Sequence, residues 1–197
     1  MRPFVRPFAL ATALLVTACT ARALAAQTTP PPADPPRTQV EPRMKEQRVN
    51  ISGTTISMRP SEDGFQEATL SAPAAALYTV LTQAFEDVGL KAKEIDQNAQ
   101  QAGTGTFRAQ YRLGKQRMST FVDCGLDGMG LRQADSYAMS FRVTTQIVPE
   151  GAERATIRTL VQATGRPASN SGLEIHCPSL GTLEQKLAQA VAARASQ

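Results

Sequence analysis

The residue types best suited to chemistry in this chain are its cysteines and its single histidine. The cysteines are Cys19, Cys124 and Cys177, and His176 directly precedes the last of them. A thiolate can act as a nucleophile or a metal ligand, and an imidazole can act as a base or a ligand. Cys124, His176 and Cys177 would nominally supply three zinc ligands. Neighbouring residues on a strand point to opposite faces, however, and the chain has no CxxC or HxxxH spacing, so the pattern does not favour a metal site.

Cys124 and Cys177 are instead expected to form a disulfide bond. If Cys19 is lipidated or removed with a signal peptide, an even pair of cysteines remains in an exported chain. Oxidising compartments outside the cytoplasm favour disulfides between such pairs. The bond would close a loop of about 53 residues, which the chain-entropy model credits with about 4 kcal/mol.

Other stretches resemble catalytic or ligand-binding motifs but lack the necessary partners. A Ser-His-Asp triad would have to use His176, and the chain has no GxSxG motif to hold a serine. The stretch CGLDGMG at 124–130 is followed by no Lys-Ser or Lys-Thr pair, so a turn-rich loop is favoured over a phosphate site. Asp123 and Asp127 lack the further spaced oxygen ligands of a calcium site. We therefore expect no catalytic residues, no cofactor and no enzymatic activity.

Cys19 follows a segment typical of an export signal. Arg2 and Arg6 give a positive start, and residues 8–18 form an apolar stretch of eleven residues. A membrane-spanning helix needs about 20 apolar residues, so this stretch is too short to cross a bilayer. The sequence VTAC at 16–19 resembles a bacterial lipobox. It predicts cleavage after residue 18 and attachment of acyl chains to Cys19.

A later cleavage is the alternative. ALA at 23–25 and LAA at 24–26 suit ordinary signal peptidase, and cleavage near Ala25 or Ala26 would release a soluble periplasmic or secreted protein. In lipoproteins, a residue other than aspartate after the lipidated cysteine, here Thr20, implies sorting to the outer membrane. The first reading therefore predicts a palmitate-type lipid anchor on the periplasmic side of that membrane.

The remainder of the chain divides into a tether and one domain. Residues 27–43 contain six of the thirteen prolines, which exclude a helix or a central strand and favour an extended spacer. A tail with no role is the alternative. We assign residues 1–18 to the signal peptide, 19–46 to the lipid-attachment cysteine and Pro-rich tether, and 47–197 to a single α+β domain.

Composition and charge narrow the class of partner. The chain has 197 residues and is 42% hydrophobic, which is enough for one core, but it is only 5% aromatic and lacks tryptophan. Its formal charge of +4 falls to +2 when residues 1–18 are removed, and no three basic residues are consecutive. Nucleic-acid binding needs a concentrated basic face, so it is not expected. The expected partners are the membrane, through the lipid anchor, and other envelope proteins.

Hydrophobic periodicity predicts two amphipathic helices. Residues 71–89 repeat apolar side chains with helical spacing, and Ser71 is expected to cap the start. Residues 178–194 place Leu180, Leu183, Leu187 and Val191 on one face. Thr182 and Gln185 have capping-box spacing.

Alternating apolar and polar residues predict an antiparallel sheet. The expected strands are 66–70, 90–96, 105–113, 117–124, 136–148, 154–163 and a short one within 173–177. PEGAE at 149–153 is expected to form a hairpin turn. These elements predict an α+β, helix-grip-like fold with about five to seven strands and two helices on one face. Arg108, Arg112 and Arg142 fall on the polar face, which would be solvated or, alternatively, would face an acidic partner.

Residues 70–113 resemble the repeated domain of the BamC family of outer-membrane assembly lipoproteins. The shared features are the helix AALYTVLTQAFEDVGL, the acidic Glu94 and Asp96 in the strand that follows, and Gly103 opening the next strand. This chain has one such domain rather than two, and the resemblance does not account for the cysteine pair. BamC proteins are non-enzymatic accessory subunits, so the resemblance implies a structural or protein-interaction role.

The order of elements is also similar to START-type helix-grip domains. Those domains enclose an apolar ligand between the sheet and a long C-terminal helix, which implies binding of a small apolar ligand as the alternative function. A cavity of about 300 Å³ or more beneath the final helix would favour ligand binding. A filled core with an exposed apolar or charged sheet edge would favour binding of a protein partner.

Overall fold

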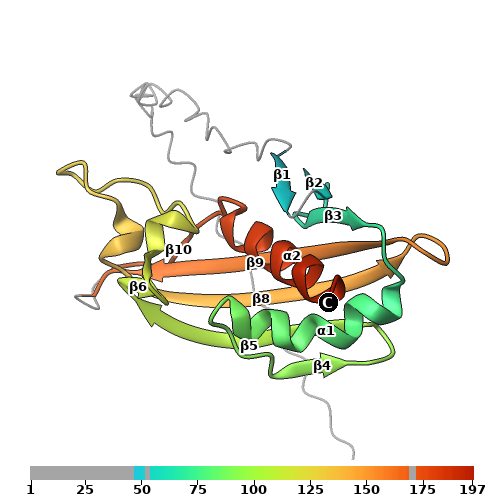
Figure 1. Cartoon of the computed structure of the whole chain (residues 1–197). Helices are drawn as coiled ribbons and strands as arrows, with labels where there is room; N and C mark the ends of the chain where they lie inside the picture. Colours follow the sequence, from blue (N-terminus) through green and yellow to red (C-terminus); the bar gives the residue numbers. More distant parts are fainter. Residues whose placement is uncertain (1–46, 52–53, 169–171) are drawn as a thin grey trace, which may run out of the picture. The chain divides into compact units, whose positions relative to one another are not determined.

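The computed structural model describes residues 47–51, 54–168 and 172–197, which form an antiparallel sheet with two long helices on one face (Figure 1). The predicted signal peptide, Cys19 and the Pro-rich tether lie outside the described residues. Within the described ranges, every helix is too short or too polar to cross a membrane.

The sheet explains most of the fold. Its strands are β1 (Gln47–Ile51), β2 (Thr54–Pro60), β3 (Gln66–Leu70), β4 (Glu94–Asp96), β5 (Gln101–Gln110), β6 (Arg112–Leu113), β7 (Gln116–Arg117), β8 (Ala138–Pro149), β9 (Ala155–Arg166) and β10 (Ile175–His176). Their order is β1-β2-β3-β9-β8-β5-β6-β7, with β10 also pairing β9 and β4 also pairing β5. Three of them have only two residues, which leaves seven longer strands among the described residues. The predicted α+β fold class is therefore confirmed.

The long hairpin of β8 and β9 forms the centre of the sheet. The two strands pair along their whole length, from Ala138 opposite Arg166 to Pro149 opposite Ala155. Alternate residues of β8 are buried, as the sequence pattern predicted. The predicted turn is confirmed, because Gly151 has a φ of +115° that most other residues avoid.

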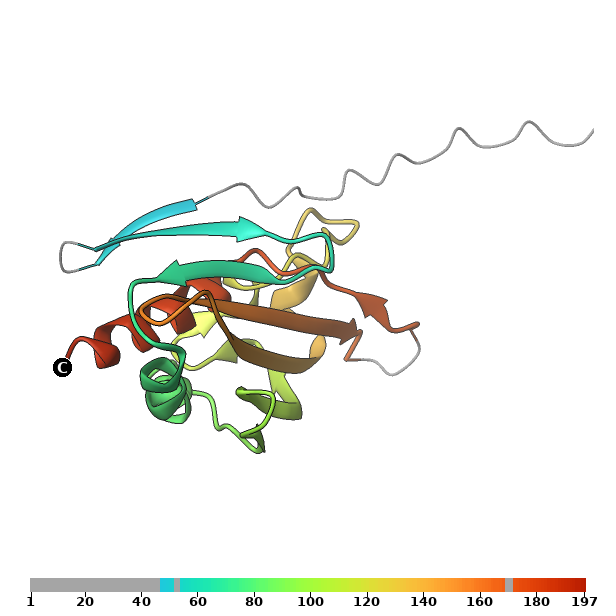
Figure 2. The same ribbon diagram turned by 90° about the vertical axis from the view of Figure 1, so that its right-hand side faces the viewer.

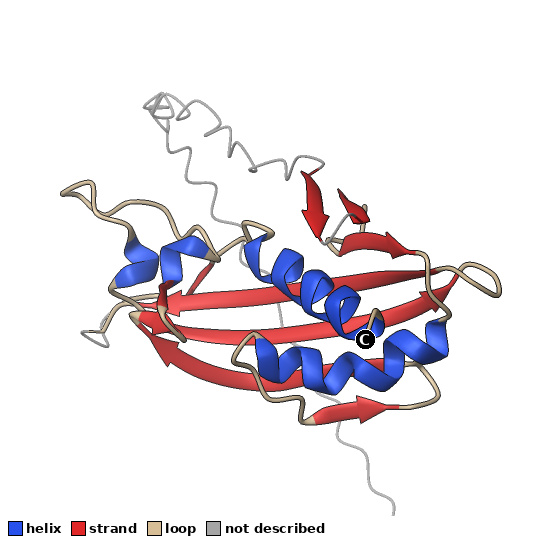
Figure 3. Cartoon of the chain, in the orientation of Figure 1, coloured by secondary structure: helices blue, strands red, loops and turns tan. Residues whose placement is uncertain are grey.

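The helices α1 (Ala74–Asp87) and α2 (Thr182–Ala195) cover one face of this sheet (Figures 1 and 3). Figure 2 shows both helices on the same side of the strands. Helix α1 ends because Gly89 takes a φ of +81° and the Leu90 N–H donates to the Phe85 carbonyl at 2.8 Å. The core between helices and sheet includes the fully buried Leu77, Leu81, Phe85, Phe141, Val143, Leu187 and Val191.

Both predicted helix caps are wrong. The residue before α1 is Pro73, and no side chain caps the helix there, so Ser71 lies too far upstream. The residue before α2 is Gly181, with a φ of +78°. Thr182 is then already the first helical residue, and its side chain cannot occupy the capping position that a capping box requires.

Several predicted strand limits are also wrong. Of residues 90–96, only β4 is a strand, since Leu90 closes the end of α1. The strand predicted at 105–113 starts at Gln101 and stops at Gln110, because Tyr111 takes a φ of +63° and turns the chain into β6. Of residues 117–124, only Arg117 lies in a strand, β7; the 3-10 turn η1 (Met118–Thr120) and irregular chain follow it. The apolar side chains of this segment are buried without strand pairing along its length.

Candidate functional site

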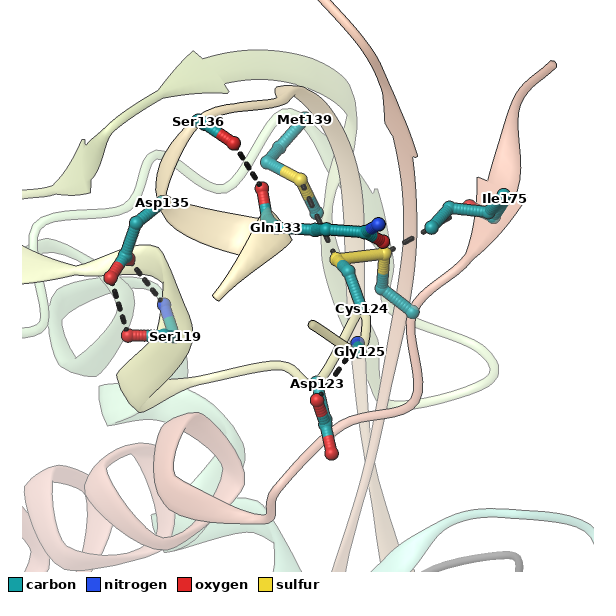
Figure 4. The surroundings of a disulfide bond; sticks show 10 residues. Ser119, Asp123, Cys124, Gly125, Gln133, Asp135, Ser136, Met139 and Ile175 are labelled. Carbon is teal, nitrogen blue, oxygen red and sulfur yellow. Dashed lines mark hydrogen bonds between the residues drawn. A yellow bond between two sulfur atoms is a disulfide. The ribbon is translucent and has the colours of Figure 1, made fainter. Parts of the chain in front are cut away.

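Cys124 and Cys177 form a disulfide bond, shown with its surroundings in Figure 4. The two sulfur atoms are 2.12 Å apart and the two Cα atoms 4.5 Å apart. Cys177 is completely buried, and Cys124 is buried beside Met139. Cys124 does not end a central strand, as the sequence suggested, because the chain before it leaves the sheet at η1. The bond thus joins this irregular segment to the chain that enters α2.

Backbone hydrogen bonds hold the two cysteine segments side by side. Val122 forms an antiparallel bridge with Ser179. The Asp123 N–H donates to the Pro178 carbonyl at 2.9 Å, and the Leu180 N–H donates to the Phe121 carbonyl at 2.8 Å. Residues 121–124 therefore run antiparallel to 177–180, which brings the two sulfur atoms together.

His176 lies outside this buried junction. His176 lies on β10, opposite Thr164 of β9, and its side chain is exposed. The adjacent Cys177 is buried, as expected for neighbours on a strand. Within the described part of the chain, no carboxylate forms an ion pair with His176. The same residues contain no group of three or more His, Cys, Asp or Glu side chains that could hold a metal ion.

The glycine-rich loop after Cys124 is held rigidly by Asp127. One oxygen of Asp127, Oδ1, accepts hydrogen bonds from the N–H groups of Met129 at 2.9 Å and Leu131 at 2.8 Å. The Gly130 N–H donates to the Asp127 carbonyl at 3.0 Å, and Leu126 bridges to Arg132 across the loop. The predicted turn-rich loop is confirmed, and the Asp127 carboxylate accepts hydrogen bonds from the backbone of that loop.

This loop exposes a set of large apolar side chains that the sequence pattern does not indicate. Leu126, Met129 and Leu131 are 62%, 82% and 60% exposed, and we call these three residues the apolar loop tip. Asp135 braces the base of the loop, because its carboxylate accepts hydrogen bonds from the Ser119 N–H at 2.9 Å and hydroxyl at 2.8 Å. The disulfide bond lies at the same base (Figure 4). The tip is thus presented by a fixed support.

A second feature missed from the sequence is a buried carboxyl in the first turn of α2. Glu184 is 1% exposed, and its Oε2 atom has no hydrogen-bond partner within the described residues. Desolvation by burial raises the pKa of Glu184 to about 7, although hydrogen bonds from Ser179 and from backbone N–H groups act in the opposite direction. The burial of a single glutamate among apolar helix positions is not visible in the sequence pattern.

The space between the sheet and α2 is filled by side chains. Leu183, Leu187 and Val191 are at most 1% exposed, and they reach the core from the sheet-facing side of the helix. A groove of about 630 Å³ exists elsewhere, along the flank of α2 beside the end of α1 and the turn between β6 and β7. There the Lys186 ammonium lies 5.5 Å from the centre of the Phe121 ring. The groove is a surface feature and does not separate the helix from the sheet.

The predicted polar sheet face carries the three arginines singled out from the sequence. Arg108, Arg112 and Arg142 are all exposed. Arg142 donates to Glu94 at 2.7 Å, and Arg112 donates to the Lys115 carbonyl at 3.1 Å. Arg108 borders a recess of about 300 Å³ at the edge of β5.

Comparison with known proteins leaves the family open. No protein-family model matches this chain, and no curated protein matches it either.

Proposed function

We propose that this chain is a non-enzymatic lipoprotein of the cell envelope that acts by binding protein partners. The apolar loop tip carries this proposal. Burying a leucine or methionine side chain is worth about 1.5–3 kcal/mol, and a chain that holds three of them in water has forgone that stabilisation. Contiguous exposed apolar surface on a soluble domain typically marks an interaction site.

The rigidity of the loop strengthens this interpretation. A mobile loop could fold its apolar residues back onto the domain, but the hydrogen bonds to Asp127 and Asp135 hold the backbone of the loop in one conformation. A surface that is already ordered loses less conformational entropy when it binds. These features favour a docking loop for a protein surface.

The filled core argues against the alternative function, binding of a small apolar ligand. A helix-grip binder needs an enclosed cavity beneath its final helix. In this chain Leu187 and Val191 occupy that position and are fully buried. The open groove on the outer flank of α2 would leave an apolar ligand largely in contact with water.

The proposed location combines three supports. The lipobox at 16–19 predicts lipidation of Cys19, and the non-aspartate Thr20 implies the outer membrane. The disulfide between Cys124 and Cys177 suits an oxidising compartment such as the periplasm. The resemblance of residues 70–113 to the BamC family agrees with an accessory role there.

Intact mass of the mature protein, extracted from its native membrane, tests the location. We expect a chain that starts at Cys19, carries acyl chains and contains no alkylatable thiol. A chain that starts near Ala26 or Gln27 would contradict lipidation. Two free thiols would contradict the disulfide. Native mass spectrometry of the same sample tests the alternative function, because a co-purified apolar molecule bound to each chain would favour ligand binding.

Crosslinking in the native envelope tests the docking role. A photoreactive residue at Met129 in the full chain should capture a defined protein, and Leu126→Ser with Leu131→Ser should abolish that capture. Leu173→Ser is the matched control, because Leu173 is 88% exposed but lies on a different segment. Capture that survives the double substitution, or is lost equally in the control, would refute docking through the apolar loop tip.

A further inference from the structure

We propose that the free edge of β5 is a second interaction surface, which binds an extended acidic segment of a partner protein by strand addition. This inference rests on the proposed role in partner binding and names the chemistry of one partner segment. It is carried by an unpaired stretch of strand, an apolar recess and a cluster of unpaired cations, all at the same place.

The first observation is the unpaired edge itself. Along one side, β5 pairs with β8 from Gln101 to Gln110, apart from a bulge between Gly103 and Thr106. On the other side, β4 pairs only with residues 101–103, and β6 pairs only with Gln110. Between these points, no strand in the described ranges covers the outer side of β5. Alternate N–H and C=O groups of a strand point away from its partner, so such an edge can accept another strand.

The second observation is an apolar recess beside this edge. It has a volume of about 300 Å³, and its apolar lining includes Leu90, Phe107, Ala109 and Leu113. The Phe107 ring stacks on the buried Phe141 ring at a centroid distance of 5.7 Å, which fixes its position. Leu90 is held by its backbone hydrogen bond to Phe85. A strand added at this edge could place an apolar side chain in the recess, which is the usual source of specificity in strand addition.

The third observation is the charge around the recess. Lys91, Lys93 and Arg108 all line it. The Lys93 N–H donates to the Gly103 carbonyl at 2.8 Å, so this lysine segment is fastened next to β5. No carboxylate of the described chain forms an ion pair with any of the three cations.

Four arginines elsewhere in the domain have such partners. Arg142 pairs with Glu94, Arg158 with Asp63 and Glu67, Arg166 with Glu174, and Arg194 with Asp87. The three cations at the recess have no such partner among the described residues and lie together, which makes the recess a positive site. Carboxylates of a partner are the complementary groups.

The same cations select against a second copy of this chain. Two β5 edges placed together would bring Arg108 and the two lysines of one copy close to those of the other, and like charges in this position repel. An acidic strand has the opposite charge. Because side chains alternate between the faces of a strand, a segment alternating acidic and apolar residues would fit best. Its apolar groups would enter the recess, and its carboxylates would lie near Arg108 and the two lysines.

A short peptide of alternating Glu and Val with blocked ends is the probe. Its affinity for the full mature chain is measured by fluorescence anisotropy at low and high salt. We expect Lys91→Glu with Lys93→Glu to weaken binding about tenfold or more, and high salt to weaken it too. Arg132→Glu is the matched control, because Arg132 is an exposed cation on the loop after Cys124 and should not affect the affinity.

Amide hydrogen exchange locates the binding. Peptide should slow exchange at amides within residues 106–109, and a peptide with alternate amides N-methylated should bind weakly because it cannot complete a ladder. Equal binding of a Lys-Val peptide, equal binding by the doubly substituted chain, no protection at β5, or no binding of the Glu-Val peptide would each overturn the inference.

Crosslinking separates failure of this inference from failure of the proposed function. Photoreactive residues are placed at Thr106 on β5 and, separately, at Met129 in the apolar loop tip. Capture at Thr106 of a segment that mass spectrometry shows to be acidic supports the inference. Capture at Met129 alone refutes the inference and leaves the proposed function standing. Absence of capture at both positions refutes both.

Discussion

Replacing Glu184 with glutamine should stabilise the domain at neutral and alkaline pH. The carboxyl is 1% exposed and one of its oxygens has no partner among the described residues, so its ionised form is poorly solvated in the folded chain. Burial raises its pKa from 4.5 to about 7. Glutamine has nearly the same shape, can still accept the hydrogen bond from Ser179, and carries no charge that needs solvation.

The magnitude follows from the pKa of the folded and unfolded chains. Between pH 4.5 and 7 the folded chain holds the proton on Glu184 and the unfolded chain releases it. The free energy of unfolding therefore falls as pH rises through this range, and the loss is complete above pH 7. Each pKa unit corresponds to about 1.4 kcal/mol, so the total loss is about 3 kcal/mol. Below the unfolded pKa, both states hold the proton and the penalty is absent.

Urea unfolding of the oxidised protein, repeated across this pH range, measures the effect. The two proteins should have similar stability at the acidic end, and Glu184→Gln should be more stable by about 3 kcal/mol at the alkaline end. The difference between them cancels contributions from groups that both chains share. Glu86→Gln, which alters an exposed carboxyl on α1, controls for the change from acid to amide. Stability curves for wild type and Glu184→Gln that stay parallel over the whole range would refute the reasoning.

Two further sets of substitutions test other parts of the domain by urea unfolding. Replacing Cys124 and Cys177 together with alanine should lower the free energy of unfolding by about 4 kcal/mol, because the disulfide closes a long loop in the unfolded chain. An unchanged urea midpoint would show that the disulfide does not restrict the unfolded chain in this way. The hydroxyls of Thr145 and Thr159 hydrogen-bond at 3.1 Å in the core. Thr145→Val alone should lower the free energy of unfolding by about 1–3 kcal/mol, because it leaves the Thr159 hydroxyl without this partner. The double valine variant should lose much less stability. A double variant as unstable as the sum of both single variants would contradict this pairing.

The parts of the fold that the sequence predicts well are those with long, regular patterns. The alternation over 136–148 runs for many residues, and only a half-buried strand satisfies it. Helix α1 and helix α2 likewise each repeat an apolar face over several turns. In these segments local preference and tertiary packing agree, so the pattern alone is sufficient.

The β5 region shows why other parts were mispredicted. Gly103 and Gly105 lie inside β5, although glycine is uncommon within strands. Gly105 has a φ of +63° and forms part of a bulge, and a side chain there would come within 3.3 Å of the Glu94 carboxylate. The sequence shows the glycines but not the pairing with β8, whose register shifts between Gly103 and Thr106.

The candidate sites also differ in how far the sequence predicts them. The pairing of Cys124 with Cys177 could be proposed from the number of cysteines and from the export signal that the sequence predicts. The apolar loop tip and Glu184 could not, because both depend on exposure. A glutamate in the first turn of a helix is ordinary and usually solvated, and only the packed domain shows that this one is enclosed.

The position of α2 in the sequence has a consequence for how the domain acquires its structure. Strand β3 must pair with a strand almost a hundred positions later, as with Gln66 and Thr159, and α2 comes later still. Such distant pairings form slowly. The apolar face of the β8–β9 hairpin therefore stays exposed to other molecules until α2 packs on it. Incomplete chains can therefore aggregate through this apolar face, and a chaperone that binds nascent chains would reduce the aggregation.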